Sequence, residues 1–194
     1  MDESLASRKH AVIESREDEI RRYFSCRDVS KFDVGECLLH SSSVVNLKPY
    51  PSTSYFTFYD TAKDRRIFVS SRVTAQSALF QQEHGIAYSF NVLKKSTNHE
   101  SFHYMSNKRR QWWIDNMMHV AIQMLDSEGD IVLYCLQGRS RSPMYLVAYL
   151  VIIYNMSADA AMNEVREMLY NGRGEELDRF GCLKPIIELI HCRI

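Results

Sequence analysis

The hydrophobic positions of this chain alternate in one segment and form short continuous runs in others, and both patterns predict β-strands. Residues 55–59 alternate and are rich in β-forming side chains, and a polar turn at 60–65 separates them from the apolar segment 67–69. This arrangement predicts a hairpin. Two further apolar runs, 86–92 and 131–135, predict buried strands.

Helical spacing of apolar residues predicts helices over much of the remaining chain. The expected helices are residues 8–25, 75–82, 107–126, 144–154, a segment that starts after Ser157, and 180–191. Gly85 is placed to end the second of these helices in a left-handed conformation, and Ser157 is placed to cap the fifth. Residues 171–174 are expected to break that helix, which would leave Arg173 in a solvated turn.

The first 55 residues are expected to form an N-terminal extension (1–55) packed on a domain that spans residues 56–194. Within the extension, residues 8–25 have opposite charges four positions apart and a narrow apolar stripe, which predicts a charged helix. This helix is either a solvated helix packed on the domain or an arm for docking or dimerisation. Residues 26–53 mix serine, glycine and proline with short apolar groups and are expected to be loop with one strand.

The overall charge gives no reason to expect a nucleic-acid partner or a membrane surface. The 194 residues contain 24 lysines and arginines and 24 aspartates and glutamates, so any preference for anions is local. The five cysteines contain no Cys-x2-Cys pair, so no metal site is expected, and reduced thiols in a cytoplasmic or nuclear protein are the simpler interpretation. No secretory signal is expected, and the longest apolar run, 144–154, is too short to span a membrane.

The strongest chemical feature is the Cys135 loop, residues 135–141, which lies between a predicted buried strand and a predicted helix. Successive N–H groups in such a tight loop form an anion-binding concavity, at which the positive end of the helix dipole also points. The same field favours the thiolate of Cys135, which would make it a nucleophile near neutral pH. Gly138 allows the tight turn, and Arg141 can donate two parallel hydrogen bonds to an oxyanion. The phosphate-binding residues expected here are Leu136, Gln137, Gly138, Arg139, Ser140 and Arg141.

The Cys-x5-Arg-Ser pattern, with an apolar strand before it and an apolar helix behind it, resembles the phosphate loop of the cysteine-dependent phosphatases, most closely their dual-specificity branch. The resemblance extends from residue 60 to the end of the chain. It implies an α/β, three-layer fold with a central mixed, mostly parallel sheet flanked by helices. It also implies hydrolysis of phosphotyrosine, and of phosphoserine or phosphothreonine, in phosphorylated proteins through a phosphocysteine intermediate, without a cofactor.

The sequence departs from the resembled family where that family carries an aspartate as general acid. Residues 95–113 contain no aspartate, and the available proton donors are His99, Glu100 and His103. Glu100 is the nearest chemical substitute and ranks first, followed by His103, whose spacing to Cys135 is close to the family's usual one. The alternative is that none of them donates a proton and the segment is a surface loop. Without a general acid, aryl phosphates would be favoured, because an alkoxide needs its proton more than a phenolate does.

Three residues in or beside the loop modify this prediction. Tyr134 stands where the family usually has histidine, so the pKa of the Cys135 thiol is expected to be lowered less than in typical members. Ser142 can donate a hydrogen bond to the sulfur, cap the following helix, or do both. Arg139 is either a solvent-exposed residue or a second guanidinium that attracts a substrate with more than one phosphate.

The first functional hypothesis is an active phosphoprotein phosphatase with no metal or cofactor. The thiolate attacks phosphorus, the loop amides and a guanidinium hold the phosphoryl oxygens, and a nearby side chain moves the proton. The residues expected to carry this reaction are Cys135, Arg141, Ser142, Glu100 and His103.

Two alternatives from other functional classes remain. A weak or inactive pseudophosphatase would bind phosphorylated partners without turnover, and Tyr134 together with the missing aspartate motivates it. A phosphoinositide or other phospholipid phosphatase is motivated by Arg139. Those lipid enzymes usually carry a lysine directly after the cysteine, and that position is Leu136 here.

Overall fold

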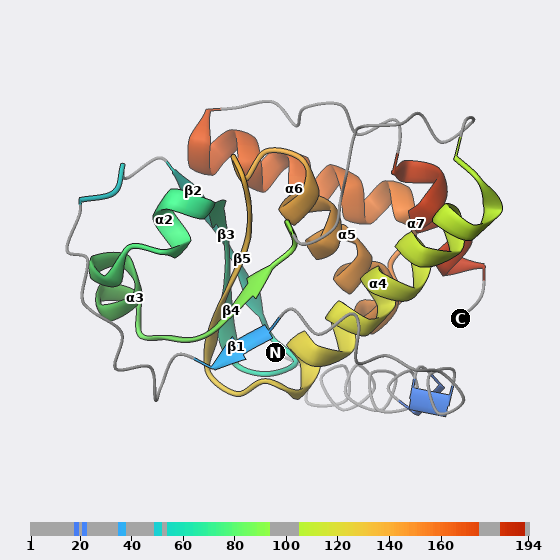
Figure 1. The fold of residues 1–194 in the computed structure, drawn as a ribbon, viewed down its shortest axis with the longest axis horizontal. Helices are drawn as coiled ribbons and strands as arrows, with labels where there is room; N and C mark the ends of the chain where they lie inside the picture. Colours follow the sequence, from blue (N-terminus) through green and yellow to red (C-terminus); the bar gives the residue numbers. More distant parts are fainter. Residues whose placement is uncertain are drawn as a thin grey trace, which may run out of the picture.

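The computed structural model is built around a β-sheet with helices on both of its faces (Figure 1). The residues that it describes are 18–19, 21–22, 35–37, 49–51, 54–93, 105–174 and 183–192. Two short helices, α2 (Arg72–Ala75) and α3 (Ala78–His84), lie on one face, and the longer helices of the second half of the chain lie on the other. This arrangement confirms the three-layer α/β fold expected from the sequence.

Five strands form the sheet in the order β1-β4-β5-β3-β2. They are β1 (Gly35–Cys37), β2 (Tyr55–Asp60), β3 (Arg65–Ser71), β4 (Ile86–Asn91) and β5 (Asp130–Cys135). The three central strands β4, β5 and β3 are parallel, whereas β1 and β2 are antiparallel edge strands, so the sheet is mixed as expected. β2 and β3 form the predicted hairpin. β5 has a hydrogen-bonded strand on each side and helices on each face, which accounts for its continuous apolar sequence.

The parallel strands end at one edge of the sheet, and Cys135 lies there. Ser71, the last residue of β3, pairs with Cys135, the last residue of β5, and Asn91 of β4 pairs with Tyr134. Side chains alternate across a strand. Tyr134 therefore packs with Phe68 in the smaller hydrophobic cluster beside α2 and α3, whereas Cys135 belongs to the larger core on the other face. Ligands of open α/β sheets bind beyond this carboxyl edge.

The helix expected at residues 75–82 is confirmed as α3, but it begins three residues later, at Ala78, and Ala75 is instead the last residue of α2. The Ser77 hydroxyl accepts a hydrogen bond from the Phe80 N–H (3.4 Å) and caps α3. This local start signal overrides the continuous helical pattern. Gly85 ends α3 with φ at 62°, as predicted.

The other face carries α4 (Asn107–Asp126), α5 (Arg141–Tyr154), α6 (Ala158–Arg173) and α7 (Lys184–His191). All residues of α5 from 142 to 153 are buried, because α4, α6 and α7 pack around it. The helices expected at 107–126 and 144–154 are confirmed, the second beginning three residues earlier than predicted. Residues 180–182 of the expected last helix lie outside the described residues. No helix in the described parts of the chain is both long and apolar enough to cross a membrane.

α6 differs from the prediction at its C-terminal end. The Ser157 hydroxyl caps it by accepting a hydrogen bond from the Ala160 N–H (3.2 Å), as predicted. The helix then continues through residues 171–173 and ends at Gly174, the last residue of the expected break at 171–174, so it runs three residues further than predicted. The reason is tertiary. Gly172 packs α6 directly on β2, where a Cβ atom would lie 2.8 Å from a strand side chain, and this packing offsets the low helix propensity of glycine.

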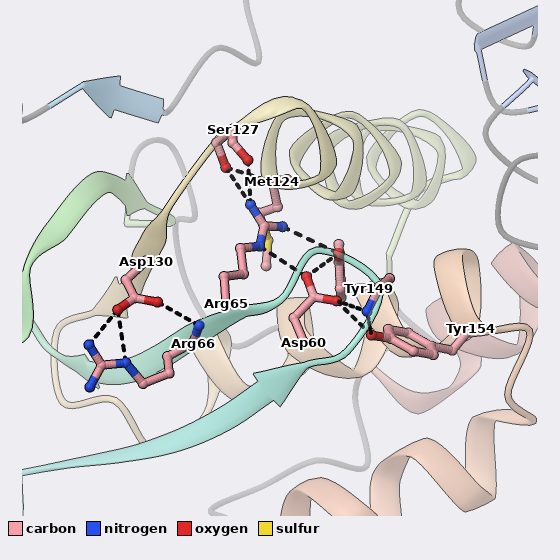
Figure 2. Close-up of polar contacts among 9 residues, drawn as sticks. Asp60, Arg65, Arg66, Met124, Ser127, Asp130, Tyr149 and Tyr154 are labelled. Carbon is pink, nitrogen blue, oxygen red and sulfur yellow. Dashed lines mark hydrogen bonds and ion pairs between the residues drawn. The ribbon is translucent and has the colours of Figure 1, made fainter. Parts of the chain in front are cut away.

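A buried polar network joins the hairpin to α4 and α5 at the end of the sheet opposite Cys135 (Figure 2). Asp60 accepts hydrogen bonds from Arg65 Nε (3.0 Å), the Tyr149 hydroxyl (2.7 Å) and the Tyr154 hydroxyl (2.6 Å). Arg65 Nη1 donates to the backbone carbonyl of Ser127 (2.6 Å), just after α4. Both charged groups are therefore hydrogen-bonded as well as paired, which buried charges require.

Few residues of the predicted N-terminal extension are described. Residues 18–19 and 21–22 are helical, in agreement with the expected charged helix, and Arg21 forms an ion pair with Asp126 at the end of α4. Residues 35–37 form the edge strand β1. The division of the chain at residue 55 stays a prediction.

Candidate active site

Two hydrogen bonds converge on the sulfur of Cys135. The Gly138 N–H donates to Sγ over 3.2 Å, and the Ser142 hydroxyl donates to it over 3.4 Å. Only 3% of Cys135 is exposed to solvent. The chain therefore turns back over the sulfur within three residues of the end of β5 and returns to it again in the first turn of α5.

These donors change the acidity of the thiol. Burial by itself raises the pKa of Cys135, but hydrogen bonds to the sulfur outweigh it. The donors are the Ser142 hydroxyl and the backbone N–H groups of Ser142, Gly138 and Gln137. The net result is a pKa below the ordinary value of a cysteine thiol, which favours the nucleophilic thiolate.

The carbonyl groups of the Cys135 loop are held by groups that lie outside it. The Leu136 carbonyl accepts a hydrogen bond from the backbone N–H of Arg72 (3.3 Å), at the start of α2. The Gln137 carbonyl accepts from both terminal nitrogens of Arg173 (3.2 Å each), and the Gly138 carbonyl accepts from Arg173 Nη1 (3.3 Å). In a trans peptide the N–H points opposite to its carbonyl. Three consecutive N–H groups are therefore turned to the other side of the loop, where the sulfur lies.

Gly138 is required by the shape of this loop. Its φ is 74°, a left-handed backbone conformation that residues other than glycine rarely adopt. A Cβ atom at this position would lie 2.6 Å from the carbonyl carbon of Ser70 and 2.6 Å from Nη1 of Arg173. The loop passes so close to β3 and to the end of α6 that no side chain fits.

The start of α5 adds a fixed dipole to the site. Ser140 occupies the N-cap position without a side-chain cap, and its carbonyl accepts from the Met144 N–H (3.2 Å). The dipole of this 14-residue helix favours an anion at its N-terminus, where the Ser142 N–H already donates to the sulfur. Ser142 lies inside the helix, so the structure supports its contact with sulfur and not the alternative that it caps α5.

Of the remaining predicted site residues, three are described by the structure and the candidate proton donors are not. Arg141, the first residue of α5, is half-buried, while Arg139 and Leu136 are exposed at the surface of the loop. The candidate proton donors Glu100 and His103 lie outside the described residues, as does His99.

Tyr134 supports the end of β5 from the face opposite Cys135. Its side chain is buried in the cluster beside α2 and α3, which also contains Phe68 and Phe80. Its backbone carbonyl accepts a hydrogen bond from the Val92 N–H (3.1 Å), at the end of β4. The residue that replaces the expected histidine thus anchors the strand from which the loop departs.

Arg173 is the residue of the site that sequence reasoning missed. The expectation of a solvated turn residue is wrong, because Arg173 is a half-buried residue at the end of α6 and its guanidinium binds the loop carbonyls. Glycines on both sides made the segment look like a turn. The contact depends on α6 continuing to residue 173, which only its packing on β2 explains.

The arrangement as a whole can hold a tetrahedral oxyanion against a thiolate. It combines inward N–H groups, a helix N-terminus and a guanidinium at the head of that helix. Within the described ranges, no group of three or more histidine, cysteine, aspartate or glutamate side chains is placed to bind a metal ion.

Comparison with known proteins agrees with this geometry. The sequence model of the family described as "Dual specificity phosphatase, catalytic domain" matches residues 67–174, which is more than half of the chain and includes the whole Cys135 loop. A search of curated proteins finds no match.

Proposed function

Because the chain belongs to the dual specificity phosphatase family, we propose that it hydrolyses phosphotyrosine, and phosphoserine or phosphothreonine, in phosphorylated proteins through a phosphocysteine intermediate. The observation that carries this proposal is the orientation of the loop peptides. Donors converge on the sulfur of Cys135 while the carbonyls of Leu136, Gln137 and Gly138 are bound from outside. Such a loop holds a phosphoryl group by its oxygens and places a nucleophile against phosphorus.

In the first step, the thiolate of Cys135 attacks phosphorus in line with the bond to the substrate oxygen. A sulfur–phosphorus bond forms as that phosphorus–oxygen bond breaks. The loop N–H groups and the guanidinium of Arg141 hold the three non-bridging oxygens, whose charge is fixed by donors already in position. No metal is needed to neutralise this charge.

The oxygen of the leaving group needs a proton in this step. Glu100 is our first candidate for the donor and His103 our second, on the sequence argument. A proton donor contributes about 10²–10⁴-fold to the rate, and more for an alkoxide than for a phenolate.

In the second step, water attacks the phosphocysteine. The sulfur–phosphorus bond breaks, inorganic phosphate forms, and the residue that gave its proton takes one from the water. The Ser142 hydroxyl, 3.4 Å from Sγ, donates to the departing thiolate and so stabilises it as a leaving group.

Turnover of an aryl phosphate by the full chain tests the proposal. We expect hydrolysis by the wild type, no hydrolysis by Cys135→Ser, and unchanged hydrolysis by Cys192→Ser, which removes an exposed thiol outside the site. Acid quenching followed by mass spectrometry should find an added phosphate on the peptide that contains Cys135. If wild type and Cys135→Ser share the same background rate, the chain is a binding module for phosphorylated partners and the proposal is wrong.

A substrate panel separates protein from lipid substrates. Phosphopeptides and soluble phosphoinositides are compared at equal concentration, with Arg139→Ala alongside. We expect higher kcat/KM on phosphopeptides and a small effect of Arg139→Ala on them. A preference for phosphoinositides that Arg139→Ala abolishes would instead assign the phospholipid reaction.

A further inference from the structure

Arg173 binds two successive carbonyl groups of the Cys135 loop from the outside. Nη1 and Nη2 each lie 3.2 Å from the Gln137 carbonyl oxygen, and Nη1 lies 3.3 Å from the Gly138 carbonyl oxygen. Carbonyl oxygens of the loop are therefore partners of this guanidinium. A planar guanidinium has the fork of donors that this arrangement requires, and an ammonium does not.

The first of these carbonyls belongs to the same peptide unit as a donor to the sulfur. The Gln137 carbonyl and the Gly138 N–H are opposite ends of one planar trans peptide. One end binds Arg173 and the other donates to Sγ of Cys135 over 3.2 Å. Rotation of this peptide would break both contacts at once, so a bond at the carbonyl end fixes the direction of the N–H end.

A charged donor at the carbonyl also strengthens the opposite N–H as a donor. Hydrogen bonds in a chain polarise one another, and those with an ionised partner are stronger than neutral ones. The Gly138 carbonyl is bound in the same way, and its peptide unit carries the Arg139 N–H. Arg173 thus orients and polarises two neighbouring N–H groups of the loop.

The position of Arg173 is itself fixed by packing. Gly172 lets α6 approach β2 so closely that an added Cβ would lie 2.8 Å from Cβ of Phe56. Gly174 then ends the helix with φ at 63°, and its N–H bonds the Tyr170 carbonyl (2.7 Å). These contacts hold the last helical residue beside the loop.

We propose that Arg173 is a positioning residue of the active site, which holds the Gln137 and Gly138 peptides so that their N–H ends face the sulfur and the phosphoryl oxygens. The inference builds on the proposed function, because the site it organises is the phosphatase site. Its effect on the thiol is nevertheless measurable without turnover. Arg173 acts through the loop backbone and does not touch the reacting atoms.

The test is the pH dependence of Cys135 alkylation by iodoacetamide in the full chain, followed by mass spectrometry of the peptide that contains Cys135. We expect Arg173→Met to raise the pKa of this thiol by about one unit, since one hydrogen bond to the thiolate is weakened. The thiolate fraction below that pKa, and with it kcat/KM for an aryl phosphate at pH 6, would fall on the order of tenfold. Arg173→Lys should give an intermediate shift, because one ammonium reaches one carbonyl well and not two.

The matched control is Arg166→Met, which removes an exposed arginine of the same helix whose guanidinium bonds Asn163 (3.1 Å). Its alkylation curve should match the wild type. If Arg173→Met does not fold, the pH dependence of Cys135 alkylation is measured in Arg173→Gln instead, and the same shift of the thiol pKa is expected.

Three outcomes overturn the inference: a folded Met or Gln variant with the wild-type thiol pKa, a shift equally large in Arg166→Met, or a Lys variant identical to the wild type. The wild type could show no turnover while Arg173→Met still shifts the pKa of the Cys135 thiol. That result would disprove the proposed function and leave this inference standing.

Discussion

The Asp60 carboxylate and the Arg65 guanidinium form an ion pair of 3.0 Å whose side chains are 0% and 2% exposed. Tyr149 and Tyr154 donate to the same carboxylate from the C-terminal half of α5 (Figure 2). Burial, aided by Asp60, raises the pKa of Tyr154 to about 12, so its hydroxyl remains a donor at any physiological pH. The pair thus ties the hairpin to the far end of α5, whose other end lies at the candidate active site.

Arg65→Met is expected to destabilise the protein strongly. It leaves the Asp60 carboxylate buried without its cation, and breaking such a pair costs about 3–5 kcal/mol. Urea denaturation measures this free energy of unfolding. Lys184→Met is the control, because it breaks a solvent-exposed pair with Asp159, in which both side chains are more than a third exposed, and such pairs contribute little to stability. Equal losses in the two variants would contradict the role given to the buried pair.

Gly138→Ala is expected to abolish the site without unfolding the sheet. The new Cβ would overlap the backbone of Ser70 and the guanidinium of Arg173, so the loop must move and its N–H groups lose their direction. Binding of vanadate, measured by calorimetry, should be lost together with the reactivity of Cys135.

The matched control for this variant is Gly85→Ala. Gly85 also has a positive φ, 62°, but an added Cβ meets nothing within 4 Å. Only the backbone strain remains, about 1–2 kcal/mol of stability, and vanadate binding should persist. If Gly138→Ala binds vanadate as well as Gly85→Ala does, the close approach of the loop to β3 is not needed for the site.

Ser142→Ala is expected to raise the pKa of the Cys135 thiol. The Ser142 hydroxyl is the largest of the contributions that lower this pKa against the opposing effect of burial. The midpoint of the alkylation curve should therefore move toward the ordinary thiol value. Ser157→Ala removes a cap on α6 and should lower stability while leaving that midpoint in place. An unmoved midpoint in Ser142→Ala would show that the hydroxyl does not bind the thiolate.

The lowered pKa of Cys135 also predicts how stability depends on pH. In the window between the folded and the ordinary value, the unfolded chain binds more protons, so stability rises with pH. The difference in unfolding free energy between the wild type and Cys135→Ser should be constant below the folded pKa, grow through this window and level off above it. Urea denaturation at several pH values measures the difference, and a difference that shrinks with rising pH would refute the lowered pKa.

Glu100→Gln is expected to reduce kcat on a phosphoserine peptide by about 10²–10⁴-fold if Glu100 donates the proton. The loss should be smaller on an aryl phosphate with an acidic leaving group, since that oxygen leaves readily without a proton. His103→Gln is measured in parallel on both substrates. A larger, leaving-group-dependent loss in His103→Gln would assign the proton to His103, and no loss in either variant would remove both residues from the mechanism.

Patterns that act over a few residues predicted much of the fold. The alternation at 55–59, the apolar run of β5, the cap at Ser157 and the left-handed Gly85 are all confirmed, because each depends on neighbouring residues. Two helix boundaries differ from the prediction: the helix expected from residue 75 begins at Ala78, and the helix expected to break within 171–174 continues to Arg173 before it ends at Gly174. In the first, the Ser77 side chain caps a new helix start. In the second, packing of Gly172 on β2 stabilises the helix across residues of low helix propensity.

The sequence by itself determined the thiol, the turn at Gly138, the helix that follows and the family, because a strand, a Cys-x5-Arg loop and an apolar helix are adjacent in the chain. Only the tertiary structure decided what holds the loop in shape. Arg72 meets Leu136 and Arg173 meets Gln137 across sequence separations that no local pattern spans. Whether these groups reach the loop depends on how α2 and α6 pack against the sheet, and packing is a property of the whole fold.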